Sequence, residues 1–117
     1  MERLYVFGTL ADVEIRGADP AQSSAALAEV SELLNQRQSE WHAWEPSDLT
    51  RINAALAAGE SAVAPASVVE LIARSRPLAE ASEGLFDPTV GGLVAAWGFH
   101  TSSFPVLSAP PGEAWLQ

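Results

Sequence analysis

The feature that most constrains the fold is a sixteen-residue stretch, residues 84–99, which reads GLFDPTVGGLVAAWGF. Asp87 followed by Pro88 is typical of a helix N-cap with proline at the first helical position, and Gly98 predicts where this short helix ends. The free N–H groups of a helix start beside the pair Gly91–Gly92 can bind an anion such as a phosphate. Ordinary turn chemistry in a tight corner accounts for the same residues without a ligand. The stretch predicts a short helix and leaves both interpretations open.

Two helices are predicted in the first half of the chain. The first runs from about Pro20 to about Trp41, because apolar residues recur there at helical spacing and an aspartate precedes the proline as N-cap. Ser47 is well placed to cap a second, shorter helix, and Gly59 ends it. These signals lie within a few residues of each helix end.

A third helix is predicted between Pro65 and Gly84, with a buried apolar stripe along one side. Pro77 removes a hydrogen-bond donor inside it and predicts a bend. Residues 101–112 are rich in proline and serine and keep no helical or strand period, so we expect a loop or linker there.

Residues 3–16 contain β-formers in partial alternation around Gly8, which predicts one strand with an irregular middle. The fold class is therefore α+β, an N-terminal strand followed by about four helices. A lone strand needs partners that the sequence does not supply. Either another copy of the chain provides them, or the chain is the front part of a longer protein.

The composition narrows the classes of partner. With 117 residues, of which 48% are hydrophobic and 18% charged, the chain is globular rather than disordered. The net charge of -9 argues against nucleic acid or an anionic membrane surface as the main partner, so an anionic ligand would need local donors or a metal. The absence of cysteine excludes disulfides, thiolate metal sites and cysteine nucleophiles. No stretch approaches the roughly 20 apolar residues of a membrane span.

Residues that could carry chemistry are sparse. His42 and His100 lack the spacing of metal ligands, so they are interpreted as polar surface or boundary residues. Asp87 could bind a cation, but capping is its simpler role. Arg51 could meet a phosphate, or it could lie on a solvated helix. Two further residues, Trp41 and Trp44, could stack on a flat ligand ring or belong to the core.

Three segments resemble one known family in the same order along the chain. Residues 84–99 closely resemble the G-x-F-D-P-T-V-G-P-L-V-x-x-W-G-F signature of the ApbE family, the FAD:protein FMN transferases. Residues 47–53, SDLTRIN, look like that family's S-E-L-S-R-L-N segment, and residues 7–9, FGT, resemble its M-G-T. The resemblance implies an ApbE-like (T-fold-like) domain.

The resemblance also implies an activity. These enzymes cleave the pyrophosphate of FAD and attach FMN to a threonine or serine hydroxyl of a target flavoprotein, with release of AMP and with Mg²⁺ required. Matched by motif, six residues are expected to contact the flavin nucleotide: Phe7, Trp44, Leu85, Phe86, Asp87 and Thr89. No catalytic residue is assigned, and the ligands of Mg²⁺ are expected outside this sequence.

The sequence departs from the family pattern in several ways. Phe7 replaces methionine, Trp44 replaces tyrosine, and Gly92 stands where proline is common. Family members are also much longer, so residues 1–117 are expected to be the N-terminal portion of a single domain and inactive by themselves. Many members carry a signal peptide and a lipoprotein cysteine; this sequence shows neither, and the compartment stays open. The alternative is a non-catalytic module that binds a flavin nucleotide or self-associates through its unpaired strand.

Overall fold

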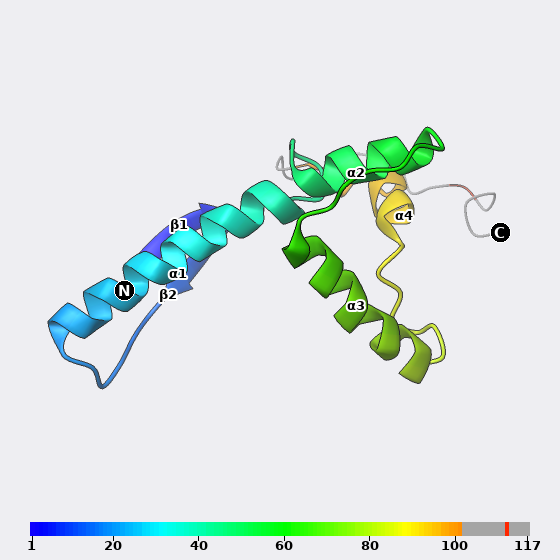
Figure 1. Ribbon diagram of the computed structural model, residues 1–117. Helices are drawn as coiled ribbons and strands as arrows, with labels where there is room; N and C mark the ends of the chain where they lie inside the picture. Colours follow the sequence, from blue (N-terminus) through cyan, green and yellow to red (C-terminus); the bar gives the residue numbers. More distant parts are fainter. Residues whose placement is uncertain (102–111, 113–117) are drawn as a thin grey trace.

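The computed structural model describes residues 1–101 and 112. It confirms the predicted α+β class, with a small sheet followed by four helices (Figure 1). The elements in chain order are β1 (Glu2–Val6), β2 (Thr9–Val13), α1 (Pro20–Trp41), α2 (Asp48–Ala57), α3 (Ala66–Ala81) and α4 (Gly91–Ala96). The predicted loop at 101–112 lies outside the described residues except at its two ends.

The N-terminal segment is a β-hairpin, so the prediction of one strand with an irregular middle was wrong. β1 and β2 pair antiparallel from Glu2 opposite Val13 to Val6 opposite Thr9. Between the strands, Phe7 and Gly8 have φ values of 54° and 74°, the left-handed pair that a two-residue hairpin turn requires. Gly8 is thus a turn residue rather than a bulge. The strand finds its partner within the chain.

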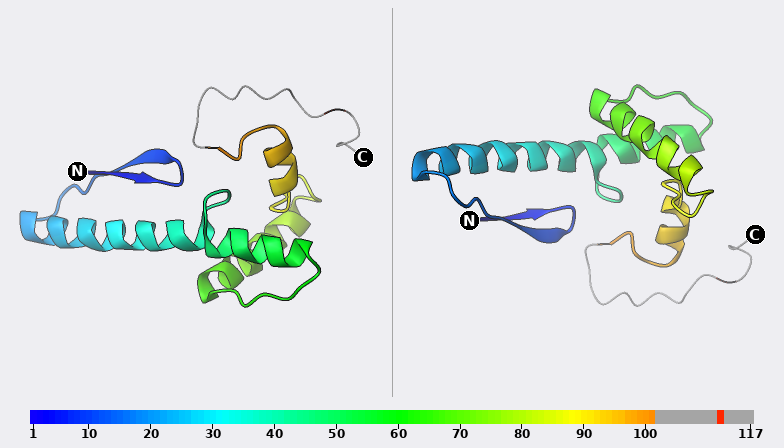
Figure 2. Two further views of the ribbon diagram at one scale, coloured as in Figure 1. Left: turned by 90° about the horizontal axis from the view of Figure 1, so that it is seen from above. Right: turned by 90° about the horizontal axis from the view of Figure 1, so that it is seen from below.

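α1 has the predicted bounds. The Asp19 carboxylate accepts the N–H groups of Ala21 and Gln22 (2.9 and 3.0 Å), and Pro20 occupies the first turn. The hairpin lies alongside this helix, with its turn directed toward the C-terminal end of α1 (Figure 2). There the backbone N–H of Phe7 donates to Oε1 of Gln38 (2.9 Å) and ties the turn to the helix.

The predicted ends of α2 and α3 are confirmed as well. Ser47 and Thr50 form a capping box at the start of α2, in which each side chain bonds the other residue's backbone N–H. Pro65 is the N-cap of α3, and Pro77 lies inside that helix. Past its end Gly84 has φ of 83° and its N–H donates to the Ala79 carbonyl (3.0 Å). The bend at Pro77 stays a prediction.

α4 begins later than the sequence predicted. Its N-cap is Val90, not Asp87. The Asp87 carboxylate instead accepts both the N–H and the hydroxyl of Thr89 (2.8 and 2.7 Å), so Asp87 and Pro88 open a separate turn before the helix. The predicted end is correct, since Gly98 has φ of 83° and follows the last helical turn.

The packing is open for a chain of this length. The radius of gyration is 17.6 Å, whereas a compact domain of about 117 residues has roughly 13 Å. Among the described residues the buried hydrophobic side chains are Val6, Ile52 and Val68. Many large apolar side chains are exposed, mainly along α3 and around α4. None of the described helices combines the length and apolarity that crossing a membrane requires.

Candidate functional site

The structure brings together two of the expected flavin-contact residues, Phe7 and Trp44, through His42. The rings of Phe7 and His42 have centroids 6.4 Å apart, and the indole of Trp44 meets His42 edge-on at 4.7 Å. His100 continues the row, 5.9 Å from Trp44. The hairpin turn, the loop after α1 and the segment after α4 therefore meet in one row of aromatic rings.

His42 is the centre of this row, and its interpretation as a surface or boundary residue was wrong. Only 4% of its surface is exposed, while His100 is partly exposed, as a boundary residue should be. The one signal in the sequence is that His42 directly follows the predicted end of α1. At that position the side chain turns back to bond the loop that leaves the helix.

The imidazole of His42 organises the loop from α1 to α2. The ring Nδ1 accepts the backbone N–H groups of Trp44 (3.4 Å) and Glu45 (3.1 Å). The backbone carbonyl of His42 accepts the Ser47 hydroxyl (2.6 Å). An imidazole nitrogen that accepts hydrogen bonds carries no proton, so the neutral ring is protonated at Nε2. The loop thereby fixes both the position of Trp44 and the tautomer of His42.

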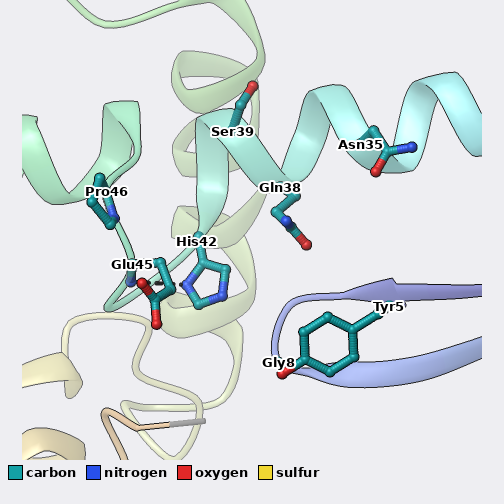
Figure 3. A pocket seen from close by; sticks show the side chains of 8 residues that line it. All are labelled: Tyr5, Gly8, Asn35, Gln38, Ser39, His42, Glu45 and Pro46. Carbon is teal, nitrogen blue, oxygen red and sulfur yellow. Dashed lines mark hydrogen bonds between the residues drawn. The ribbon is translucent and has the colours of Figure 1, made fainter.

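A pocket of about 410 Å³ opens between the hairpin and the C-terminal end of α1 (Figure 3). Its lining residues are Tyr5, Gly8, Asn35, Gln38, Ser39, His42, Glu45 and Pro46. His42 lies at one side of it, next to Trp44, and Gly8, which follows Phe7, lies at the other. Glu45 is the charged residue among those that line it, so the wall offers no lysine or arginine to a phosphate.

The other four expected site residues lie on the exposed segment between α3 and α4. Leu85 is 94% exposed and Phe86 44%, with the Phe86 N–H bonded to the Ser82 hydroxyl (2.9 Å). The Thr89 hydroxyl, and secondarily its backbone N–H, hold the pKa of Asp87 below its usual value, so this carboxylate stays ionised. Farther along the chain, after α4, His100 contacts Trp44 in the aromatic row.

A second polar cluster joins α1 to α3 around Glu40. Glu40 is 9% exposed, and its carboxylate accepts hydrogen bonds from the Ser67 hydroxyl, from the side-chain amide of Gln36 and from Arg37 (the last two at 2.9 Å). These bonds, above all the one from Ser67, lower the pKa of Glu40. The carboxylate is saturated by its neighbours, so the cluster holds two helices together.

The structure also decides two of the open alternatives. Trp41 donates from Nε1 to the Ser67 hydroxyl (3.3 Å) and carries the Arg37 guanidinium 5.2 Å from its ring centroid, which favours packing over ligand stacking. Arg51 bonds Asp48 (3.2 Å) and the Val63 carbonyl (2.9 Å), as on an ordinary capped helix. Within residues 1–101 and 112, no three acidic, histidine or cysteine side chains group closely enough to hold a metal ion.

The chain belongs to the ApbE family, whose model matches residues 7–115. It is also 47% identical over 104 residues to an FAD:protein FMN transferase of Rhodobacter capsulatus. That match covers 89% of this chain but 20% of the relative, so the chain spans about a fifth of the relative's length. No solved structure matches the chain.

Proposed function

We propose that this chain is part of an FAD:protein FMN transferase, which moves FMN from FAD to a threonine or serine hydroxyl of a target flavoprotein and releases AMP. The observation that carries the proposal is the 47% identity to the Rhodobacter capsulatus transferase across most of the chain. Because the chain spans a fifth of that relative, we expect the isolated chain to be weakly active or inactive.

In the proposed reaction the acceptor hydroxyl oxygen forms a bond to the FMN phosphorus of FAD. The bond from that phosphorus to the bridging oxygen breaks, the oxygen leaves with AMP, and the hydroxyl proton passes to a base. Mg²⁺ supplies neutralisation of the charge that grows on the phosphoryl oxygens. No described residue is assigned as its ligand or as the base. The part proposed for this chain is to bind and orient FAD.

The residues proposed to contact FAD are those expected from the family motif. Phe7 and Trp44 present aromatic surface beside the pocket at the end of α1. Leu85 and Phe86 are exposed apolar side chains, which a bound ligand or a neighbouring segment can cover. Asp87 and Thr89 form a preorganised polar turn next to them. We also propose that residues 1–117 are the N-terminal portion of one domain.

The second candidate function is a non-catalytic module that binds a flavin nucleotide or self-associates. What favours it is the two-stranded sheet, because β1 and β2 pair only with each other and each keeps an open edge within the described part of the chain. Light scattering tests whether the chain self-associates. A strictly monomeric chain that FAD does not stabilise against thermal unfolding contradicts both self-association and flavin-nucleotide binding.

The transfer reaction itself is tested by incubating the natural full-length gene product with FAD, Mg²⁺ and a target flavoprotein that carries an acceptor threonine. Mass spectrometry then looks for covalently attached FMN, with the 117-residue chain assayed in parallel. A target whose acceptor threonine is replaced by valine is the matched control. Absence of FMN on the target after incubation with the full-length product sinks the proposal.

A further inference from the structure

One half of α3 is apolar, as its sequence predicted, but most of this stripe is not buried. Val68 is buried, whereas four large side chains on the same half of the helix are each 40 to 60% exposed: Val69, Leu71, Ile72 and Leu78. At about 3.6 residues per turn, these positions share one half of the helix circumference. The apolar face of α3, as we call these four side chains, is therefore formed but uncovered.

α3 is attached to the rest of the described chain near its start. There the Ser67 hydroxyl bonds the Glu40 carboxylate and accepts the Nε1–H of Trp41 (3.3 Å), and the helix then extends away from α1 (Figure 1). Farther along, the half-buried positions on this side of the helix carry small residues: Ser75, Ala79 and Ser82. The chain thus covers a narrow line along the stripe and leaves larger side chains exposed on both sides of it.

The charges on α3 do not oppose an apolar partner. Arg74 pairs with Glu70 (2.6 Å) and Arg76 pairs with Glu80 (3.3 Å), each along the helix. Two acidic and two basic residues leave α3 without net charge, in a chain whose net charge is -9. An apolar surface can therefore pack on this helix without desolvating an unpaired charge.

A second copy of the chain is a poor candidate to cover this face. Two copies that each carry a net charge of -9 repel one another. A stable interface between separate proteins also takes roughly 20 to 30 residues a side, many more than α3 offers. A segment of the same polypeptide covers a small face more readily, because it does not lose the translational freedom of a separate molecule.

The transferase relative has ample chain to provide such a cover. The match extends over 89% of this chain and 20% of the relative, so about four-fifths of the relative lies outside it. We propose that the apolar face of α3 is an intramolecular interface, which packs against an apolar surface of the polypeptide beyond residue 117. This inference rests on the proposed function, in which residues 1–117 are the N-terminal portion of a longer transferase.

The interface would also act on the segment that follows α3. Ser82, directly after the last residue of the helix, accepts the N–H of Phe86 through its hydroxyl (2.9 Å). Packing that fixes α3 therefore fixes the start of the exposed segment proposed to contact FAD.

The absence of cysteine from this chain permits a direct test. Ile72→Cys and Leu78→Cys each place one thiol in the apolar face, and Ala73→Cys places one at an exposed position on the other half of α3 as the matched control. Each variant is made in the 117-residue chain and in the natural full-length product. Both are treated with iodoacetamide, and peptide mapping by mass spectrometry measures the labelling rate at the substituted position.

A thiol covered by packing reacts only when the packing opens. In the 117-residue chain we expect the three thiols to react at similar rates that do not depend on protein concentration. In the full-length product we expect labelling of Ile72→Cys and Leu78→Cys to slow by at least about tenfold, with the rate for Ala73→Cys unchanged.

Thermal unfolding provides a second measurement. Leu78→Glu puts a carboxylate into the proposed interface, so we expect the melting temperature of the full-length product to fall by at least about 5 °C. The same substitution should hardly change the 117-residue chain, where Leu78 is exposed. Ala73→Glu is the matched control and should leave both proteins as stable as before.

The proposal is overturned if Ile72→Cys and Leu78→Cys react as fast in the full-length product as in the 117-residue chain, or if all three thiols are slowed alike. It is also overturned if both are already protected in the 117-residue chain. Protection that grows with concentration would then identify a second copy as the cover, and protection independent of concentration would identify a segment of the 117-residue chain itself.

FMN transfer by the full-length product is measured separately. Transfer without protection of the two thiols removes this proposal alone. Protection without transfer removes the proposed function and leaves the interface.

Discussion

The two regions that carry the family resemblance differ in how firmly the structure holds them. The residues around the pocket, Phe7, His42 and Trp44, are linked by hydrogen bonds and ring contacts between the hairpin, α1 and the following loop. The stretch 84–99 carries the most distinctive sequence, yet Leu85 is almost fully exposed. A distinctive motif therefore need not lie in a well-packed part of the chain. Its side chains are available for contacts with a ligand or another part of the protein.

The largest expected effect is loss of the buried imidazole. His42→Ala leaves the N–H groups of Trp44 and Glu45 without their acceptor and opens a cavity, so we expect the free energy of unfolding to fall by about 2 to 4 kcal/mol. Urea denaturation measures it. His42→Asn, which retains the acceptor, should lose clearly less. Equal losses for the two variants would mean that the loop hydrogen bonds are not what makes this region firm.

A substitution in the hairpin turn tests the backbone of the region around the pocket. Gly8→Ala puts a Cβ at φ of 74°, which costs about 1 to 2 kcal/mol. Gly91→Ala is the control, since φ is ordinary there and nothing lies within 4 Å of the added carbon; we expect it to be neutral or slightly stabilising. Thermal unfolding compares them. A Gly8→Ala chain as stable as wild type would contradict the observed turn.

The Glu40 cluster predicts a pH dependence. Folding lowers the pKa of the Glu40 carboxyl. The contribution of Glu40 to stability is therefore present above the pKa of the unfolded chain, near 4.5, and is lost as pH falls through the pKa of the folded chain. Ser67→Ala removes the hydroxyl, the largest cause of the shift. We expect the melting temperature of this variant to fall less steeply below pH 4.5 than that of wild type. Ser24→Ala, at an exposed position on α1, should retain the wild-type slope. Parallel curves for wild type and Ser67→Ala would contradict the assignment.

The smallest effect on stability is expected in the exposed segment between α3 and α4. Leu85→Ser should change the free energy of unfolding by no more than about 0.5 kcal/mol, because the side chain is 94% exposed. If the segment contacts FAD as proposed, the same variant weakens FAD binding by the full-length product severalfold, measured by fluorescence titration. Val63→Ser, also strongly exposed but outside the motif, is the control. A large loss of stability in Leu85→Ser would erase the contrast between the two regions.

The sequence alone determined the elements whose signals are local. Asp19 with Pro20, the Ser47 cap and Gly98 act within about four residues along the chain, so they predicted the starts of α1 and α2 and the end of α4 correctly. The family, too, was recognisable from motifs that read in order. Asp87 is the local failure, because its carboxylate bonds Thr89 in a turn and the helix begins only at Gly91.

Tertiary structure decided what depends on residues far apart. Phenylalanine rarely adopts a positive φ, so sequence reasoning missed the reversal at Phe7; its N–H bonds Gln38, a residue 31 positions away, which helps to hold the turn. The one local signal for His42 is its place after the predicted end of α1, and no local pattern brings its ring to Phe7, which lies on the hairpin. The pocket exists only because the hairpin lies alongside the C-terminal end of α1.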